Sequence, residues 1–337
     1  MSTLAPDRGR TAERYRLWGL RDARGLSPSY EALALAVADD EDVLALIDTL
    51  PVRQRLPTIV FAASRILGAP VSDPRAWREW FLGSFDELAP IAASRTTQTN
   101  EAARCALYLP ALTGIDGPIA LLELGASAGL CLYPDRYSYR YATPDGVVSL
   151  DPPDGRSAVV LECEALGPVP FPRRPPEIVW RAGIDLNPLD VRSPDDLAWL
   201  EALIFPEHDD RRSRLRAAAA IVAEEPPRLF RGDIMELLKP VAAQAPPDAT
   251  LVVVHTVAVS YLPKPDRARF LERVRELPGH WVSDEPQTAF AGIPLADPGD
   301  FAELGTLTSD FALLLDGRQV AFAQPHGRAL RWLRPPE

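Results

Sequence analysis

The chain has 337 residues, with 47 acidic and 36 basic side chains and a formal charge of −11 at pH 7. Because this charge repels phosphate groups and anionic lipid headgroups, we expect neither a nucleic-acid partner nor a membrane partner. The first residues lack the apolar core of a secretion signal, and the three cysteines form no C-x-x-C pair. We therefore expect a cytoplasmic protein that acts on a small molecule. No ligand pattern predicts a metal site, and metal dependence and oligomeric state stay open.

The amino-terminal third of the chain has the pattern of a helical domain. Apolar residues recur at helical spacing from residue 12 to about residue 112, as in Ile59, Val60, Ala63 and Ile66. Proline and glycine separate the segments. Chains of this length commonly divide into two domains. We predict a helical cap domain over residues 1–115 and a second domain over residues 116–337.

Short apolar runs that end in glycine or an acid characterise the second domain. Such runs are typical of strands buried on both faces of a parallel sheet, and helical patterns separate several of them. The predicted strands cover residues 119–124, 178–184, 228–231, 251–254 and 281–282, and the predicted helices cover residues 195–205, 211–223 and 266–277. This order predicts an α/β fold with a doubly wound sheet.

Two segments depart from this repeating unit. Residues 133–176 contain the alternating Tyr137, Tyr139 and Tyr141 before a proline-rich stretch, which predicts a small β insertion. Near the end of the chain, residues 311–315 and 319–323 flank the turn Asp316-Gly317. This pattern predicts an antiparallel carboxyl-terminal hairpin that closes the sheet.

The segment LLELGASAGL, residues 121–130, joins the first predicted strand to a loop of small residues. In one interpretation this is a nucleotide-binding loop. Gly125 and Gly129 would let the backbone approach a ligand, and a following helix would offer free N–H groups. Glu123 stands at the end of the strand.

Three later strand ends support this interpretation, because they carry Asp185, Asp233 and His255. In a doubly wound sheet, ligands bind at the edge formed by the carboxyl ends of the strands. Carboxylates there would accept hydrogen bonds from ribose hydroxyls and adenine amino groups. Each residue also has a structural explanation, since acids at strand ends cap helices and a histidine in an apolar strand is usually a core residue.

Two other interpretations stay open. Residues 125–129 read G-x-S-x-G, the nucleophile elbow of α/β-hydrolases, in which Ser127 would attack an acyl group. His326 follows two candidate acids, Asp310 and Asp316, in the order that a triad needs. An elbow normally follows several strands and an oxyanion loop, however, whereas a helical region precedes this one. The protein could also bind a cofactor without turning over a substrate.

Several separated motifs together resemble a known bacterial family. They are LLELGASAGL, the helix opening Gln98-Thr99-Asn100-Glu101, the segment GIDLNPLD at residues 183–190, the pair Gly232-Asp233, and LVVVHTVAVSYL at residues 251–262. Over most of its length the chain is similar to the family called domain of unknown function 2332. That family resembles class I S-adenosylmethionine-dependent methyltransferases. The resemblance implies a Rossmann-like, doubly wound sheet with S-adenosylmethionine as cofactor and a small molecule as methyl acceptor.

The same resemblance implies a first cofactor loop near the amino-acid part of the cofactor. This loop would consist of Glu123, Gly125, Ala126, Ser127 and Gly129. Ser127 departs from the family of methyltransferases, because their motif has a glycine at this central position.

The resemblance also implies that Asp185 holds the ribose, that Asp233 binds the adenine amino group, and that His255 faces the methyl donor and acceptor. Asp185 follows Glu123 by 62 positions, whereas simple dinucleotide folds have roughly 20. The predicted insertion accounts for the longer interval.

A polar cluster opens an apolar helix just before the first predicted strand. N-capping needs one polar residue, and this cluster has several. We therefore expect Gln98 to face the cofactor, and Asn100 and Glu101 to serve the reaction. The helical cap would be a lid over the acceptor pocket. A methyltransferase must hold donor and acceptor at near-attack distance, and His255 or Glu101 would remove a proton from a hydroxyl or amine acceptor.

Overall fold

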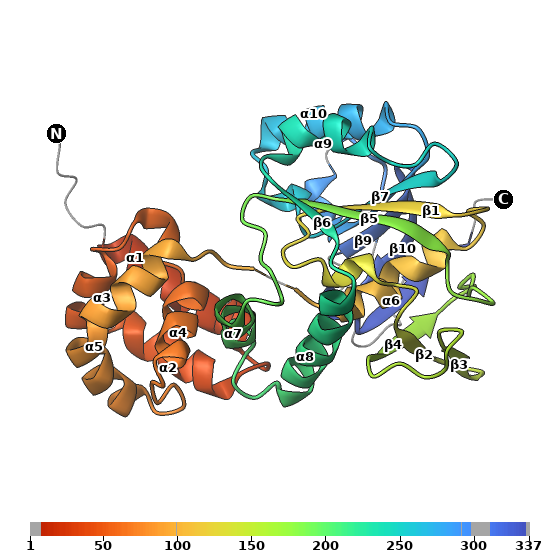
Figure 1. Cartoon of the computed structure of the whole chain (residues 1–337). Coiled ribbons are helices and arrows are strands. Elements are labelled where there is room, and N and C mark those ends of the chain that lie inside the picture. Colours follow the sequence, from red (N-terminus) through yellow and green to blue (C-terminus); the bar gives the residue numbers. More distant parts are fainter. Residues whose placement is uncertain (1–7, 99, 291, 298–310, 335–337) are drawn as a thin grey trace. The chain divides into compact units, whose positions relative to one another are not determined.

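The computed structural model describes residues 8–98, 100–290, 292–297 and 311–334 (Figure 1). The chain divides into two compact units: a helical unit of residues 1–99 and 192–213, and a sheet unit of residues 100–191 and 214–337. These bounds differ from the predicted boundary at residue 115. Residues 100–112 belong to the sheet unit because their short helices pack against its strands. Residues 192–213 belong to the helical unit although they lie between two strands in sequence.

The helical unit confirms the helical periodicity of the amino-terminal third. Its helices are α1 (Arg8–Trp18), α2 (Pro28–Ala38), α3 (Glu41–Ile47), α4 (Pro57–Ile66), α5 (Pro74–Ser94) and α7 (Pro194–Ala202). Several begin at a proline that follows a capping residue, as at Asp73, whose side chain accepts hydrogen bonds from the backbone N–H groups of Arg75 and Ala76. None of the helices described in the chain is both long and apolar enough to cross a membrane.

The core of the helical unit is aromatic. Phe61 lies at its centre, with the rings of Tyr15, Tyr30 and Trp77 at 5.1–5.8 Å from its own. Helix α7 joins this unit because the buried Trp199 donates a hydrogen bond of 3.0 Å to the carbonyl oxygen of residue 96. The amphipathic helices therefore bury their apolar faces around one core.

The sheet unit has a mixed α/β fold with one large, mostly parallel sheet. The order of its eleven described strands is β3-β2-β4-β11-β10-β9-β8-β7-β1-β5-β6. The strands are β1 (Ile119–Leu124), β2 (Ser138–Thr143), β3 (Gly146–Leu150), β4 (Val160–Leu166), β5 (Ile178–Asp185), β6 (Arg228–Arg231), β7 (Thr250–Thr256), β8 (His280–Pro286), β9 (Phe311–Leu315), β10 (Arg318–Ala323) and β11 (Ala329–Trp332).

Helices cover both faces of the sheet (Figure 1). Apolar residues of α9 (Ile234–Ala242) and α10 (Lys264–Arg275) pack with alternate residues of β1, β5 and β7 in one buried cluster. The short helix α6 (Cys105–Tyr108) contacts β8 and β4. Helix α8 (Asp209–Glu224) begins in the helical unit and ends in the sheet unit.

The five parallel strands β6-β5-β1-β7-β8 reverse their winding at β1. From β1 the chain adds β5 and β6 on one side, and it then adds β7 and β8 on the other side. The junction of β1 and β7 is therefore a topological switch point. Open α/β sheets bind their ligands outside the carboxyl ends of the strands at such a point.

The predicted β insertion and the predicted hairpin are both present, and both belong to this one sheet. Strands β2 to β4 form the insertion, and β4 pairs with β11, a strand that the sequence did not predict. Tyr137, Tyr139 and Tyr141 are buried on one face, and their hydroxyls donate to backbone carbonyls at 2.6–2.9 Å. Asp316 and Gly317 both have positive φ, as a tight hairpin turn requires.

Candidate functional site

The loop after β1 needs its glycines for the protein's own packing. Gly125 and Gly129 have φ of +72° and +76°. A Cβ atom at Gly125 would lie 2.8 Å from the Cβ of Ala258, and one at Gly129 would lie 2.9 Å from Cγ of Pro227. Ala126 is buried below the loop and contacts the site of Gly183. Protein atoms therefore occupy the space that the sequence interpretation reserved for a ligand at these two glycines.

The expected helix after this loop is absent, so that part of the prediction was wrong. Only a 3₁₀ turn, Leu130–Leu132, follows the loop. An α-helix starting there would need an N–H group at residue 134 to bond the carbonyl of Leu130, and Pro134 has none. The hydroxyl of Tyr137 donates a hydrogen bond to the carbonyl of Leu130 instead, at 2.6 Å. The loop therefore does not have the helix N-terminus that was expected to offer free N–H groups to a ligand.

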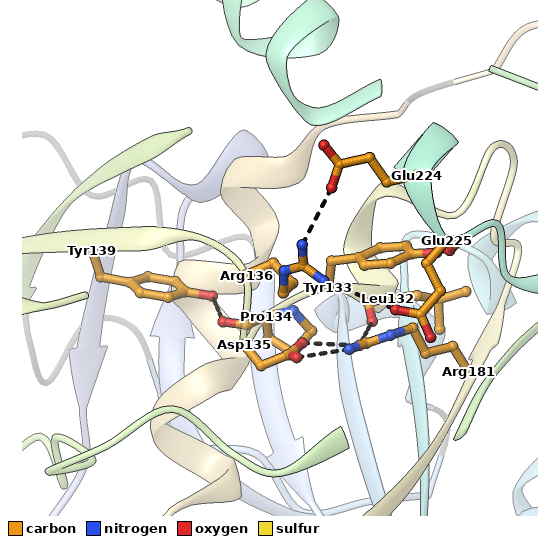
Figure 2. A network of polar contacts seen from close by, with 9 residues as sticks. All are labelled: Leu132, Tyr133, Pro134, Asp135, Arg136, Tyr139, Arg181, Glu224 and Glu225. Carbon is orange, nitrogen blue, oxygen red and sulfur yellow. Dashed lines mark hydrogen bonds and ion pairs between the residues drawn. The ribbon is translucent and has the colours of Figure 1, made fainter. Parts of the chain in front are cut away.

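A polar network fixes the segment after the turn (Figure 2). Arg181 on β5 forms a bidentate ion pair with Asp135 at 2.7–2.9 Å and donates to the carbonyl of Leu132 at 2.5 Å. Its guanidinium lies 4.6 Å from the ring centre of Tyr133. The hydroxyl of Tyr133 in turn donates to the carbonyl of Glu225. These contacts hold the exit of the β1 loop against β5 and the end of α8.

Asp185 lies beside the loop and fixes its conformation. Its Oδ2 accepts the backbone N–H of Ser127 at 2.9 Å, and its Oδ1 accepts that of Asn187 at 2.7 Å. Ser127 has a φ of +51°, which is uncommon for a residue other than glycine. The structure therefore brings Asp185 and Ser127 together, as the sequence suggested, and uses the carboxylate to hold the loop.

Asp233 caps a helix. Its Oδ1 accepts the backbone N–H of Met235 at 2.7 Å at the start of α9. This is the structural explanation that the sequence also allowed, and it satisfies one of the free N–H groups of the helix.

His255 lies in the core, and both of its ring nitrogens are engaged. Trp281 Nε1 donates to Nε2 at 2.8 Å, and Nδ1 lies 2.8 Å from Oε1 of Glu285. Because an indole N–H can only donate, Nε2 is the acceptor and the proton belongs on Nδ1. The ring is fully buried between Trp281 and Phe270. In this position it presents no free nitrogen to a substrate.

Glu285, which the sequence analysis missed, fixes the loop after β7. Its carboxylate accepts the backbone N–H groups of Ala258, Val259 and Ser260 at 2.7–3.1 Å, besides the contact with His255. Burial raises the pKa of Glu285, but the hydrogen bonds from His255 and from the backbone N–H groups of Val259 and Ala258 outweigh it and lower the pKa. Glu285 is therefore ionised, and it fixes the loop whose Ala258 lies against Gly125.

Backbone strain marks the same edge of the sheet. Val257 follows β7 directly and has a φ of +57°, a genuine outlier for a β-branched residue. With Ser127 after β1, it places a left-handed residue at each of the two strand ends that flank the switch point. Strain of this kind concentrates at functional sites because the surrounding structure must maintain it.

The face of the sheet opposite His255 carries an unsatisfied acidic cluster. The strand register places Glu123 of β1 beside Val254 of β7, and Thr256 of β7 beside Asp284 of β8. Val254 and Thr256 are two residues apart and therefore point to the same face of the sheet. The side chains of Glu123, Thr256 and Asp284 thus share one face. Arg104, in the 3₁₀ turn Ala102–Arg104, donates from Nη1 to the carbonyl oxygen of Thr256 at 2.9 Å and to its hydroxyl at 3.2 Å. We refer to Glu123, Asp284, Thr256 and Arg104 as the acidic cluster.

Both acids of this cluster have raised pKa values. For Glu123, burial and then the neighbouring Cys131 raise the pKa well above its usual value, although Arg104 opposes them. For Asp284, burial raises the pKa to about 7. The charge of Arg104 lowers this pKa, and the charge of Glu285 raises it further. Perturbed carboxyl groups at a ligand-binding edge indicate a functional site.

Asn100 and Glu101 precede Arg104 in the chain and also have buried polar contacts. Oδ1 of Asn100 accepts the backbone N–H of Leu130 at 3.3 Å. Glu101 is buried, accepts the N–H of Ala103 and forms an ion pair of 2.8 Å with Arg214. The structure thus gives Glu101 a capping and pairing role. Gln98 lies in the helical unit, and the lid role of that unit stays a prediction.

Five buried polar atoms near this edge have no hydrogen-bond partner within the described residues. They are Nδ2 of Asn100, Oε2 of Glu123, Oγ of Ser127, Oγ of Ser283 and Oδ1 of Asp284. Each such atom costs about 1–3 kcal/mol. Their concentration at the switch point indicates a place built for a polar ligand. The described residues contain no group of three potential metal ligands, and Asp310 lies outside them.

The missed residues carry a readable signal. Asp284 and Glu285 follow the apolar pair Trp281-Val282 after one serine, but the predicted strand ended at Val282. Arg104 is a charged residue within an apolar segment. Both features identify buried polar groups, although neither reveals their partners.

The family model described as "uncharacterized protein conserved in bacteria (DUF2332)" matches residues 12–332. The chain therefore belongs to this bacterial family, as its motifs predict. None of the curated proteins matches it.

Proposed function

We propose that this protein is an S-adenosylmethionine-dependent methyltransferase with a class I, Rossmann-like sheet and a small-molecule acceptor. The observation that carries the proposal is the set of oxygens at the β1–β7 switch point, above all Oε2 of Glu123, for which the described residues supply no hydrogen-bond partner. These oxygens call for a ligand that donates hydrogen bonds and carries positive charge. S-adenosylmethionine has an α-ammonium group and a sulfonium, so it meets both demands.

The residues present fit such a cofactor. Glu123 would bind the ammonium group, and in doing so it would release the proton that burial favours in the free protein. Asp185 keeps the β1 loop in place through Ser127, and its carboxylate oxygens have further lone pairs for a ribose hydroxyl. Glu285 and His255 hold the β7 loop. When bound, S-adenosylmethionine supplies an activated methyl group.

The hydrolase alternative has less support. A nucleophile elbow is a strand–turn–helix unit, and here a 3₁₀ turn follows Ser127. Asp316, one of the candidate triad acids, contacts Nδ1 of His280 and accepts the backbone N–H of Trp281. Labelling of Ser127 by a fluorophosphonate would nevertheless favour it, since a methyltransferase would not react.

The proposal is tested by isothermal titration with S-adenosylmethionine and S-adenosylhomocysteine. We expect the wild-type protein to bind both, and Glu123→Gln to weaken S-adenosylmethionine binding by about 1.5–3 kcal/mol, the usual contribution of a hydrogen bond to a charged group. Glu162→Gln is the matched control, because Glu162 is exposed on β4. A folded wild-type protein that binds neither ligand would exclude the proposed cofactor.

A further inference from the structure

Asp284 is a second buried acid at the proposed site, separate from the residue that would bind the cofactor's ammonium. It lies at the carboxyl end of β8, and β7 separates that strand from β1, which carries Glu123. The register places both acids on the same face of the sheet. Asp284 is therefore beside the proposed cofactor position, toward the half of the edge formed by β7 and β8.

The surroundings of Asp284 leave its carboxyl group available. Its side chain is buried, with 2 % of the residue exposed, and Oδ1 has no hydrogen-bond partner among the described residues. Arg104 is the neighbouring cation, but it donates to Thr256 and forms no ion pair within the part of the chain that the structure describes. An acid kept buried without a direct partner lowers stability, which favours a role in binding or catalysis.

We propose that Asp284 takes the proton from the methyl acceptor, and that the acceptor is therefore an amine or a hydroxyl compound. This inference rests on the proposed methyltransferase function. The acceptor N–H or O–H bond breaks, and its proton passes to Oδ1 of Asp284. The freed electron pair forms the new bond to the methyl carbon, while the methyl–sulfur bond breaks and leaves its electron pair on sulfur.

The charges around Asp284 suit this role. Arg104 faces it from the segment before β1, Glu123 lies on the same face of β1, Thr256 is its partner on β7, and Glu285 follows it on β8. Burial raises the pKa of Asp284 to about 7, with the charge of Arg104 opposing and that of Glu285 adding to the effect, and this pKa suits a general base near neutral pH. A carboxylate or phosphate acceptor needs no base, and the two acids would repel it.

Sinefungin provides a direct probe of this position. In this analogue of S-adenosylmethionine, a carbon that bears an amino group replaces the sulfonium and its methyl. Its ammonium would therefore stand where the transferred methyl group meets the acceptor. S-adenosylhomocysteine has no charge there and serves as the reference ligand. The affinities of both ligands are measured by isothermal titration at pH 8.

We expect the wild-type protein to prefer sinefungin over S-adenosylhomocysteine by roughly ten- to a hundredfold, the usual effect of a charge-assisted hydrogen bond. Asp284→Asn should reduce this preference to about threefold or less while S-adenosylhomocysteine affinity is retained. Asp248→Asn is the control, because Asp248 is exposed in the loop before β7. It should leave the preference unchanged.

The possible failures are distinguishable. If Asp284→Asn keeps the full preference, the role of Asp284 is wrong and the proposed function stands. If the wild-type protein binds neither ligand, both proposals fall. If the variant does not fold, the wild-type preference is measured against pH. It should rise up to about tenfold per pH unit below pH 7 and level off above it, and a constant preference would refute the inference.

Discussion

Replacing Asp284 by asparagine should remove a pH-dependent loss of stability. Burial raises the pKa of this acid from 3.8 to about 7 in the folded protein, with Arg104 opposing and Glu285 adding to the effect. The native state therefore keeps a proton that the unfolded chain has already released. The resulting stabilisation is complete below about pH 4 and is lost as the pH rises through about 7.

The size of the effect follows from the two pKa values. One pKa unit corresponds to about 1.4 kcal/mol, so a rise from 3.8 to about 7 amounts to ~4 kcal/mol at full extent. Between pH 5 and pH 8, ~2.5 kcal/mol of this stabilisation should disappear. Asparagine has nearly the same shape as aspartate and does not ionise. Relative to the wild-type protein, Asp284→Asn should therefore gain ~2.5 kcal/mol of unfolding free energy over this pH range.

Urea unfolding at several pH values, followed by far-ultraviolet circular dichroism, measures this difference. Comparing the two proteins at each pH cancels the contributions of all other titrating groups. Asp248→Asn again serves as the control, since its exposed side chain should leave the difference flat. A wild-type-to-variant difference that stays constant from pH 5 to pH 8 would show that Asp284 is not a buried acid with a raised pKa.

Two further predictions concern residues for which the structure shows a packing or capping role. Gly125→Ala should lower the unfolding free energy by about 2–4 kcal/mol, because it combines a left-handed backbone with a close contact to Ala258. Gly117→Ala, with a similar φ of +77° and open space around it, should cost only about 1–2 kcal/mol, and equal losses would exclude the contact as the cause. Asp233→Ala should lower stability by about 0.5–2 kcal/mol through loss of the helix cap. Titration should find unchanged S-adenosylmethionine affinity in this variant, and a large loss would restore Asp233 to the cofactor site.

Local patterns predicted most of the strands of the sheet unit. Parallel strands buried on both faces have continuous apolar sequences, as at 119–124, which matches β1 residue for residue. The run at 228–231 also matches β6, an edge strand with arginines at both ends. The pairing of β4 with β11 was not predictable in the same way. It joins segments more than 160 residues apart, and nothing in either short strand specifies its partner.

The site residues show the same limit. Strand-end acids are visible in the sequence, but whether an acid caps a helix, holds a loop or faces a ligand depends on donors that are distant in the chain. Asp233 finds its donor two residues away, whereas Asp185 finds one of its donors at Ser127. The role of His255 depended on Glu285 and Trp281, which follow it by 30 and 26 residues. Motif position alone could not separate these cases.

The two faces of the sheet at the switch point differ in how well their titratable groups are satisfied, although Oγ of Ser283 on the face of His255 also has no partner among the described residues. On the face of His255, the ring nitrogens and the carboxylate of Glu285 all have partners, and the resulting network holds the β7 loop against the β1 loop. On the opposite face, Glu123 and Asp284 each have an oxygen without a hydrogen-bond partner in the described part of the chain, beside Arg104. A saturated network on one face can stabilise an unsaturated cluster on the other, because both belong to the same strands. This asymmetry supports the proposal that the chemistry lies on the face of Glu123 rather than at His255.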